Sequence, residues 1–325
     1  MEEPLVQLAL VAVVGLGAQL LAWHLRLPSI LLLLVSGFLL GPVFGLISPG
    51  SLLGEALFPL VALSVGIILF EGGLTLKVKE LSASGPVVSR LISVGALATW
   101  VVAALGARYV LGFDWPLAIL SGAILIVTGP TVVGPLLRQI RPKGRAGTIL
   151  KWEGILIDPV GAVLAVLVFE IIALGGGVSV PGFVLLGVIR TLAVGIVLGL
   201  LGAAVLVALM RRHLIPDYLQ SGVTLMLVVC FFTLGDLLAA EGGLLTVTLM
   251  GIVLANQTYV SVHHIIEFKE NLQVLLIGVL FILLAGRVEI ESLIAVGWPA
   301  LAFTALLIVV ARPLAGLLPT GPPPP

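Results

Sequence analysis

The chain has 325 residues, of which 60% are hydrophobic and 10% are charged, and its formal net charge is +0. This composition excludes an ordinary soluble domain, and the balanced charge gives no indication of a nucleic-acid partner. Cys230 is the only cysteine, which excludes an intrachain disulfide and a cysteine metal cluster. We therefore expect an all-α polytopic membrane protein without a cofactor.

Apolar runs close to 20 residues, the length that lets a helix cross a bilayer, recur along the whole chain. The acidic start Met1-Glu2-Glu3-Pro4 lacks the basic region of a cleaved signal peptide, so the first run is expected to remain as a helix. Pro28, Pro116 and Pro181 stand near starts of runs, where a missing N–H costs little. We expect about eleven spans in one transmembrane domain, residues 1–317, before a proline-rich tail, residues 318–325. The expected spans are 5–24, 29–47, 55–76, 87–110, 116–138, 148–174, 182–210, 218–238, 242–256, 271–286 and 293–317.

Basic residues alternate between successive loops of this arrangement. One set of loops carries most of them, and the other carries little beyond Arg108 and Arg287. The positive-inside rule then places the loop 139–147 in the cytoplasm and the N-terminus outside, in the plasma membrane. The basic set comprises Arg26, Lys77, Lys79, Arg90, Arg138, Arg141, Lys143, Arg145, Lys151, Arg211, Arg212, Lys269 and Arg312.

The span 116–138 contains two Gly-Pro pairs, Gly129-Pro130 and Gly134-Pro135. Each proline deprives the carbonyl four residues earlier of its helical donor, so the span is predicted to be broken. Non-helical backbone inside a membrane is tolerated beside protein or a water-filled cavity, and transporters use such half-helix ends to hold ions. Thr128 and Thr131 flank the first pair and are candidate ligands. A simple proline kink is the alternative.

Asp158 lies in the hydrophobic stretch from Thr148 to Leu174. A carboxylate at that depth costs about 2.5–3.5 kcal/mol on the insertion scale, which marks it as a functional candidate. Gly154 lies four residues earlier on the same helical face and is expected to clear space beside the carboxylate.

Glu153 lies five residues before Asp158, about 140° around the helix, so the two cannot hold one ion as an i, i+4 pair would. We expect Asp158 to hold the ion or proton and Glu153 to pair with a cation elsewhere. The alternative is that Asp158 is a structural acid paired with a basic residue. Glu71 is a third candidate, with an interfacial, solvated glutamate as the alternative.

Three segments together resemble the cation/proton antiporter-1 family, the sodium/proton exchangers of bacteria. They are Leu69-Phe70-Glu71-Gly72-Gly73-Leu74, Val127-Thr128-Gly129-Pro130-Thr131 and Trp152 to Asp158, and they occur in the family's order. The resemblance implies an inverted-repeat fold with a dimerisation domain and a mobile core. It also implies that Asp158 binds the ion, that Glu71 and Thr128 assist, and that Glu153 bonds a core arginine.

The sequence departs from the family pattern at several positions. Ile157, Gly154 and Gly129 stand where members usually have Asn, Ser and Asp, which leaves selectivity between Na+ and K+ open. Members also have two more helices after Arg312-Pro313, including the second broken helix and the arginine that would pair with Glu153. We therefore expect an incomplete second repeat, with little exchange by this chain alone, and no cytoplasmic regulatory domain within it.

The function that these features predict is antiport of Na+ or K+ against H+, by competition at Asp158. The protein is then a homodimer in lipid, its ligands are small cations, and it is not an enzyme. The alternatives are a cation channel and a structural membrane subunit. A channel needs an open ring of ligands, whereas one buried aspartate on a broken helix suits an occluded site better.

Overall fold

The computed structural model describes residues 3–81, 84–140, 142, 144–173, 180–260 and 263–320, and some side chains within these helices are not described. All regular structure in these ranges is helical. Seven helices are long and apolar enough to cross a membrane, and a bent pair, Asn271–Gly286 with Ile290–Val296, makes up to eight. Three shorter apolar helices, Ser29–Val43, Trp115–Ile124 and Gly242–Asn256, coincide with further expected spans. The chain is therefore a multi-pass membrane protein.

The first half of the chain forms helices whose starts follow the proline pattern. Pro28 immediately precedes α2, and Pro116 is the second residue of α8, as expected. Two spans, 29–43 and 85–109, contain π-helical segments, which are wider turns than the α-helix makes. The elements are α1 (Pro4–Leu25), α2 (Ser29–Phe38), η1 (Leu39–Val43), α3 (Pro49–Leu53), η2 (Gly54–Ala56), α4 (Leu57–Leu74), α5 (Val78–Leu81), α6 (Gly85–Arg90), η3 (Leu91–Gly95), α7 (Ala96–Tyr109), α8 (Trp115–Ile124) and α9 (Pro130–Ile140).

The second half contains the longest helices. Pro159 lies inside α10 without ending it, and Pro181 is the second residue of α11. A π-helical segment again interrupts the last span, and the helix after it continues to Thr320, so the tail begins later than residue 318. The elements are α10 (Ala146–Ala173), α11 (Val180–Arg211), η4 (Asp217–Leu219), α12 (Gln220–Leu238), α13 (Gly242–Asn256), α14 (His263–Gly286), α15 (Ile290–Val296), α16 (Trp298–Leu306), η5 (Leu307–Ala311) and α17 (Arg312–Thr320).

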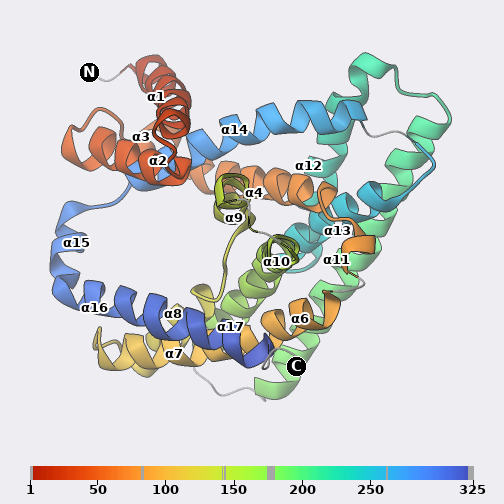
Figure 1. The fold of residues 1–325 in the computed structure, drawn as a ribbon. Coiled ribbons are helices and arrows are strands. Elements are labelled where there is room, and N and C mark those ends of the chain that lie inside the picture. Colours follow the sequence, from red (N-terminus) through yellow and green to blue (C-terminus); the bar gives the residue numbers. More distant parts are fainter. Residues whose placement is uncertain are drawn as a thin grey trace.

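The helices gather into groups around α9 and α10, which Figure 1 shows nearly end-on near the centre. Helices α1, α2 and α14 pack together on one side, and α7 and α8 pack together on the opposite side with the last span. Helix α13 packs against α4, α11 and α12. Clusters of buried apolar side chains join these helices, as expected where neighbouring helices associate by close packing.

Glycines bring α4 and α13 to backbone contact. A Cβ at Gly73 would lie 2.5 Å from the carbonyl oxygen of Thr248, and one at Gly251 would overlap the carbonyl oxygen of Phe70. Small residues permit such close approach of membrane helices. Since α4 carries Glu71, this contact fixes one wall of the candidate site.

Three polar contacts hold the ends of α4, α10 and α13 together on one side of the molecule. The Lys151 ammonium donates to the carbonyl of Thr75 at 2.6 Å. The Asn256 amide donates to the carbonyl of Leu76 and accepts from the N–H of Val78, both at 2.8 Å. Lys77 belongs to the same segment, so two members of the basic set lie at one end of the bundle.

Candidate functional site

The span between α8 and α9 is interrupted at the first Gly-Pro pair. Helix α8 ends at Ile124, α9 begins at Pro130, and residues 127–129 have no regular structure. Gly129 has φ +40°, in the region that favours glycine. Its carbonyl accepts hydrogen bonds from the N–H groups of Val132 and Val133, both at 3.2 Å. Gly129 therefore both ends the irregular segment and satisfies donors at the start of α9.

The second Gly-Pro pair does not break the span, contrary to the sequence-based expectation. Gly134 and Pro135 lie inside α9, which is helical through Ile140. A proline removes one helical hydrogen bond, and a helix can continue past that loss with a bend. The side chains of Pro130, Thr131 and Pro135 lie outside the described part of the structure, so the prediction that Thr131 is a ligand stays a prediction.

The irregular segment contacts two of the three acidic residues of α10, Glu153 and Asp158. The Thr128 hydroxyl donates to Glu153 Oε1 at 2.9 Å. The backbone N–H of Gly129 hydrogen-bonds the Asp158 carboxyl group. Glu153 and Asp158 point in different directions around α10, yet consecutive residues of the segment reach both. The irregular segment therefore connects two carboxyl groups that are five residues apart on α10 and do not share a helical face.

One oxygen of the Asp158 carboxyl group lacks a protein partner. Oδ1 is buried and forms no hydrogen bond within the described ranges. A buried carboxylate oxygen without a donor is costly, so this atom requires a proton or a cation when the site is closed.

Glycines on α10 accommodate the broken span. A Cβ at Gly161 would overlap Val127 Cγ2, and one at Gly154 would lie 3.3 Å from Val133 Cγ2. These glycines are seven residues apart, two turns along one helical face. The sequence analysis missed Gly161, although the seven-residue spacing from Gly154 could have revealed it. Val133 packs against the position of the missing Gly154 Cβ, and the expectation that Gly154 clears space beside the Asp158 carboxylate stays a prediction.

Arg312 approaches the same irregular segment from the last span. Its Nη2 atom lies 3.5 Å from the carbonyl oxygen of Val127, and its charge acts on Glu153. Within the described residues this influence is not an ion pair, so the identity of the arginine that pairs with Glu153 stays a prediction. The last span continues beyond Arg312 to Leu317, so this arginine lies inside an apolar run.

Glu71 is buried on α4, with an exposed fraction of 3%. A Cβ on the neighbouring Gly72 would lie 3.3 Å from Ile155 Cγ1, so this turn of α4 packs against α10 between Glu153 and Asp158. The alternative of a solvated interfacial glutamate is wrong, because the surrounding helices enclose the side chain.

These observations define a multi-pass helical membrane protein in which a broken span meets buried acidic residues. The profile of the transmembrane domain of sodium/hydrogen exchangers matches residues 8–320. The chain belongs to this family, whose members are transporters and not enzymes.

Named relatives agree with this assignment. The K+/H+ antiporter NhaP of Alkalimonas amylolytica is 29% identical over 316 residues, which cover 94% of this chain and 53% of the relative. The Na+/H+ antiporter 1 of Methanocaldococcus jannaschii is 25% identical over 318 residues, which cover 94% of this chain and 74% of that relative. The chain thus spans about half the length of the first of these relatives.

A solved structure shares the fold. The sodium proton antiporter MjNhaP1 from Methanocaldococcus jannaschii superposes with a TM-score of 0.83 at 24% sequence identity, covering 96% of this chain and 77% of that chain. The helical arrangement is therefore that of a known antiporter.

Proposed function

We propose that this protein exchanges a monovalent cation, Na+ or K+, for H+ across the plasma membrane by competition at Asp158. The observation that carries the proposal is the Asp158 carboxyl group. The Gly129 N–H at the helix break hydrogen-bonds this carboxyl group, and its Oδ1 atom is buried with no hydrogen-bond partner among the residues that the structure describes. The names of the relatives supply the two candidate cations.

The competition follows from the cost of an isolated charge. A buried carboxylate without a neutralising partner is unfavourable, so Asp158 holds either a proton or a cation. A low proton concentration favours the cation, and a high one displaces it. If the site changes its access to the two sides only when neutralised, the two ions move in opposite directions.

The other site residues have supporting roles in this proposal. Thr128 holds Glu153 beside the irregular segment, Arg312 contacts the Val127 carbonyl of that segment, and together they keep the Gly129 N–H directed at Asp158. Glu71 is close enough in the packing of α4 on α10 to influence the ion at Asp158. The homodimer and the external N-terminus are parts of the same proposal.

Transport in vesicles tests the proposal. The protein is reconstituted with an internal pH indicator, and Na+, K+, Li+ or choline is added outside. Wild type should release more protons than protein-free vesicles on addition of Na+ or K+ but not of choline, which differs from the sequence-based expectation that this chain alone exchanges little. Asp158→Asn should reduce the response to that of protein-free vesicles, because the amide cannot exchange a proton.

Asp217→Asn is the matched control, since Asp217 is exposed in the α11–α12 connection. It should transport like wild type. Both variants should elute as single species in detergent. A folded Asp158→Asn protein with wild-type exchange, or wild type without any cation response, would contradict the proposal.

A further inference from the structure

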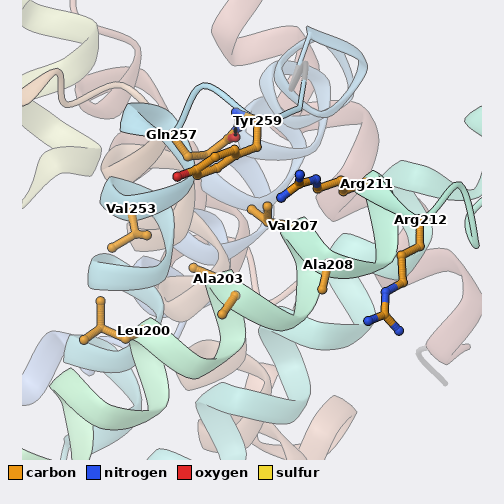
Figure 2. A pocket seen from close by; sticks show the side chains of 10 residues that line it. Leu200, Ala203, Val207, Ala208, Arg211, Arg212, Val253, Gln257 and Tyr259 are labelled. Atoms are coloured by element: carbon orange, nitrogen blue, oxygen red, sulfur yellow. Dashed lines mark hydrogen bonds between the residues drawn. The ribbon is translucent and has the colours of Figure 1, made fainter.

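A cavity lies apart from Asp158, on the side of α11 that faces α13. It has a volume of about 790 Å³, and its lining side chains come from both helices and from the turn after α13 (Figure 2). No residue of the Asp158 site lines it. Its lining residues are Leu200, Ala203, Ala204, Val207, Ala208, Arg211, Arg212, Val253, Gln257 and Tyr259.

One wall of this cavity is an apolar strip along α11. Leu200, Ala204 and Val207 recur at helical spacing on one face, and the alanines leave a recess between the larger side chains. From Leu200 to Arg211 the strip extends about 16 Å, at 1.5 Å per residue. This length is close to half of a bilayer hydrocarbon core of about 30 Å. The strip therefore matches one leaflet.

The end of the strip is cationic. Arg211 and Arg212 close α11, and the Arg211 guanidinium lies 5.6 Å from the centre of the Tyr259 ring. Figure 2 shows both arginines beyond the apolar strip, with Arg211 directed toward Tyr259. Within the described lining, no acidic side chain neutralises them. Anions are therefore attracted to this end.

The turn that carries Tyr259 is built by its own hydrogen bonds. The side-chain oxygen of Gln257 accepts from the N–H of Tyr259 at 2.7 Å and from that of Val260 at 3.0 Å. Its amide donates to the carbonyl of Val260 at 2.8 Å. The ring is thus positioned before any ligand binds.

The cationic end lies on the basic side of the molecule. Gln257 follows Asn256, whose amide donates a hydrogen bond to the carbonyl of Leu76, next to Lys77. The Lys151 ammonium donates to the carbonyl of Thr75 in the same segment. The positive-inside rule assigns this side to the cytoplasm. The cytoplasmic leaflet is where anionic lipids attract basic residues near the ends of membrane helices.

We propose that this cavity binds an anionic phospholipid of the cytoplasmic leaflet. Its phosphate lies at Arg211 and Arg212, and one acyl chain lies along the strip from Val207 to Leu200. The occupant follows from charge complementarity at one end and from the leaflet-length apolar wall. The inference does not depend on the exchange activity, because none of these residues belongs to the Asp158 site.

Native mass spectrometry of the purified protein tests this proposal. Wild type is mixed with phosphatidylglycerol or with phosphatidylcholine of the same acyl chains. Wild type should retain phosphatidylglycerol several-fold more than phosphatidylcholine. The double variant Arg211→Gln/Arg212→Gln should lose this preference. Arg190→Gln, at an exposed arginine near the other end of α11, should keep it.

A second variant separates the lipid from a free anion. Ala204→Phe fills the recess and leaves both arginines, so it should reduce phosphatidylglycerol retention. Retention that is unchanged in Ala204→Phe, or displaced fully by inorganic phosphate, would show a headgroup-only site and overturn the proposal. Equal retention of the two lipids by wild type would also overturn it.

Cross-linking distinguishes a second copy of the chain as occupant. Ala204→Cys is placed in a Cys230→Ser background, because Cys230 is exposed. In membranes this variant should form no disulfide-linked dimers under oxidation. Efficient disulfide-linked dimers would mean that the strip contacts another copy, which would contradict lipid occupancy.

Discussion

At the scale of single residues, the site depends on a few polar contacts from one irregular segment. The Thr128 hydroxyl holds Glu153, and the Gly129 N–H holds Asp158. Both donors belong to residues of the irregular segment 127–129. Adjacent residues thus set the environment of two acids whose side chains diverge on α10.

Thr128→Val should weaken both folding and exchange. Valine keeps the shape but removes the donor to Glu153, which leaves a partly buried acceptor unsatisfied at a cost of about 1–3 kcal/mol. Thr128→Ser should retain most of the stability and activity. Thermal unfolding in detergent and vesicle exchange measure the two effects.

Thr233→Val is the control, because the Thr233 hydroxyl bonds only its own helix, at the carbonyl of Val229, on an exposed face. Thr233→Val should leave the unfolding temperature and the vesicle exchange close to those of wild type. If Thr128→Val behaved like this control, the contact between Thr128 and Glu153 would have no part in holding the site.

Glu241, in the turn between α12 and α13, gives a pH-dependent prediction. Burial, and then the negative charge of Asp236, raise the pKa of its carboxyl group above the ordinary 4.5. The folded state then binds this proton more tightly than the unfolded state, so stability falls as pH rises above the ordinary pKa. Glu241→Gln should remove this pH-dependent loss of folding stability. The gain at high pH should be less than about 1 kcal/mol, because the carboxyl group is partly solvated.

Thermal unfolding at pH values below and above this window measures the effect. Glu241→Gln should be more stable than wild type at high pH and similar to it at low pH. Glu55→Gln, at an exposed glutamate, should show no such pH-dependent difference. An advantage of Glu241→Gln that grew toward low pH would contradict the sign.

At the scale of elements, α10 is shaped to receive a broken partner. Gly154 lies against α9, and Gly161 lies against the irregular segment before it. The helix stays continuous through Pro159, so α10 is the regular surface against which the break is packed. The interruption is therefore stabilised by tertiary contact as well as by the sequence of the broken span.

Gly161→Val should disrupt this packing, because its side chain would overlap Val127 Cγ2. Overpacking of this kind typically costs about 1–3 kcal/mol, and exchange should fall with it. Adding Val127→Ala to the Gly161→Val protein should restore part of the lost stability and part of the lost exchange. Unfolding temperature and vesicle exchange provide the readouts.

Gly134→Ala is the matched glycine control. No atom lies within 4 Å of a Cβ at Gly134, and its φ is not positive. Alanine there should leave stability unchanged or slightly raised, because it favours helix. Equal losses at Gly134 and Gly161 would show that the contact with Val127 is not the reason for the glycine.

At the scale of the whole molecule, an all-helical multi-pass fold was predictable from the apolar runs. The expected number of eleven spans is not confirmed, because seven described helices, or eight with the bent pair, are long and apolar enough to cross a membrane. The span 242–256 was predicted from such a run and matches α13. The role of Arg312 was not predictable in this way, since its contact with Val127 joins residues that are 185 positions apart. The continuity of α9 through Pro135 was not predictable either, since a Gly-Pro pair is compatible with a kink as well as with a break.

The orientation of the bundle is a whole-molecule prediction. In a Cys230→Ser background, Arg145→Cys should react with a membrane-impermeant thiol reagent only in inside-out vesicles. Glu289→Cys should react only in right-side-out vesicles. Both positions are exposed, so access depends on the side of the membrane. The reverse pattern would place the N-terminus in the cytoplasm.

The π-helical segment η5 changes the helical phase of the last span. Phe303 and Ala311 are both buried, although eight residues of ideal α-helix would turn them about 80° apart. A π-helical turn contains one extra residue. The eight residues from Phe303 to Ala311 therefore rotate about the helix axis by as much as about seven α-helical residues, which places the two side chains within about 20° of each other. A helical wheel drawn through residues 298–317 at constant pitch therefore assigns wrong faces after Leu306. Arg312 meets Val127 from a face that such a wheel would misplace.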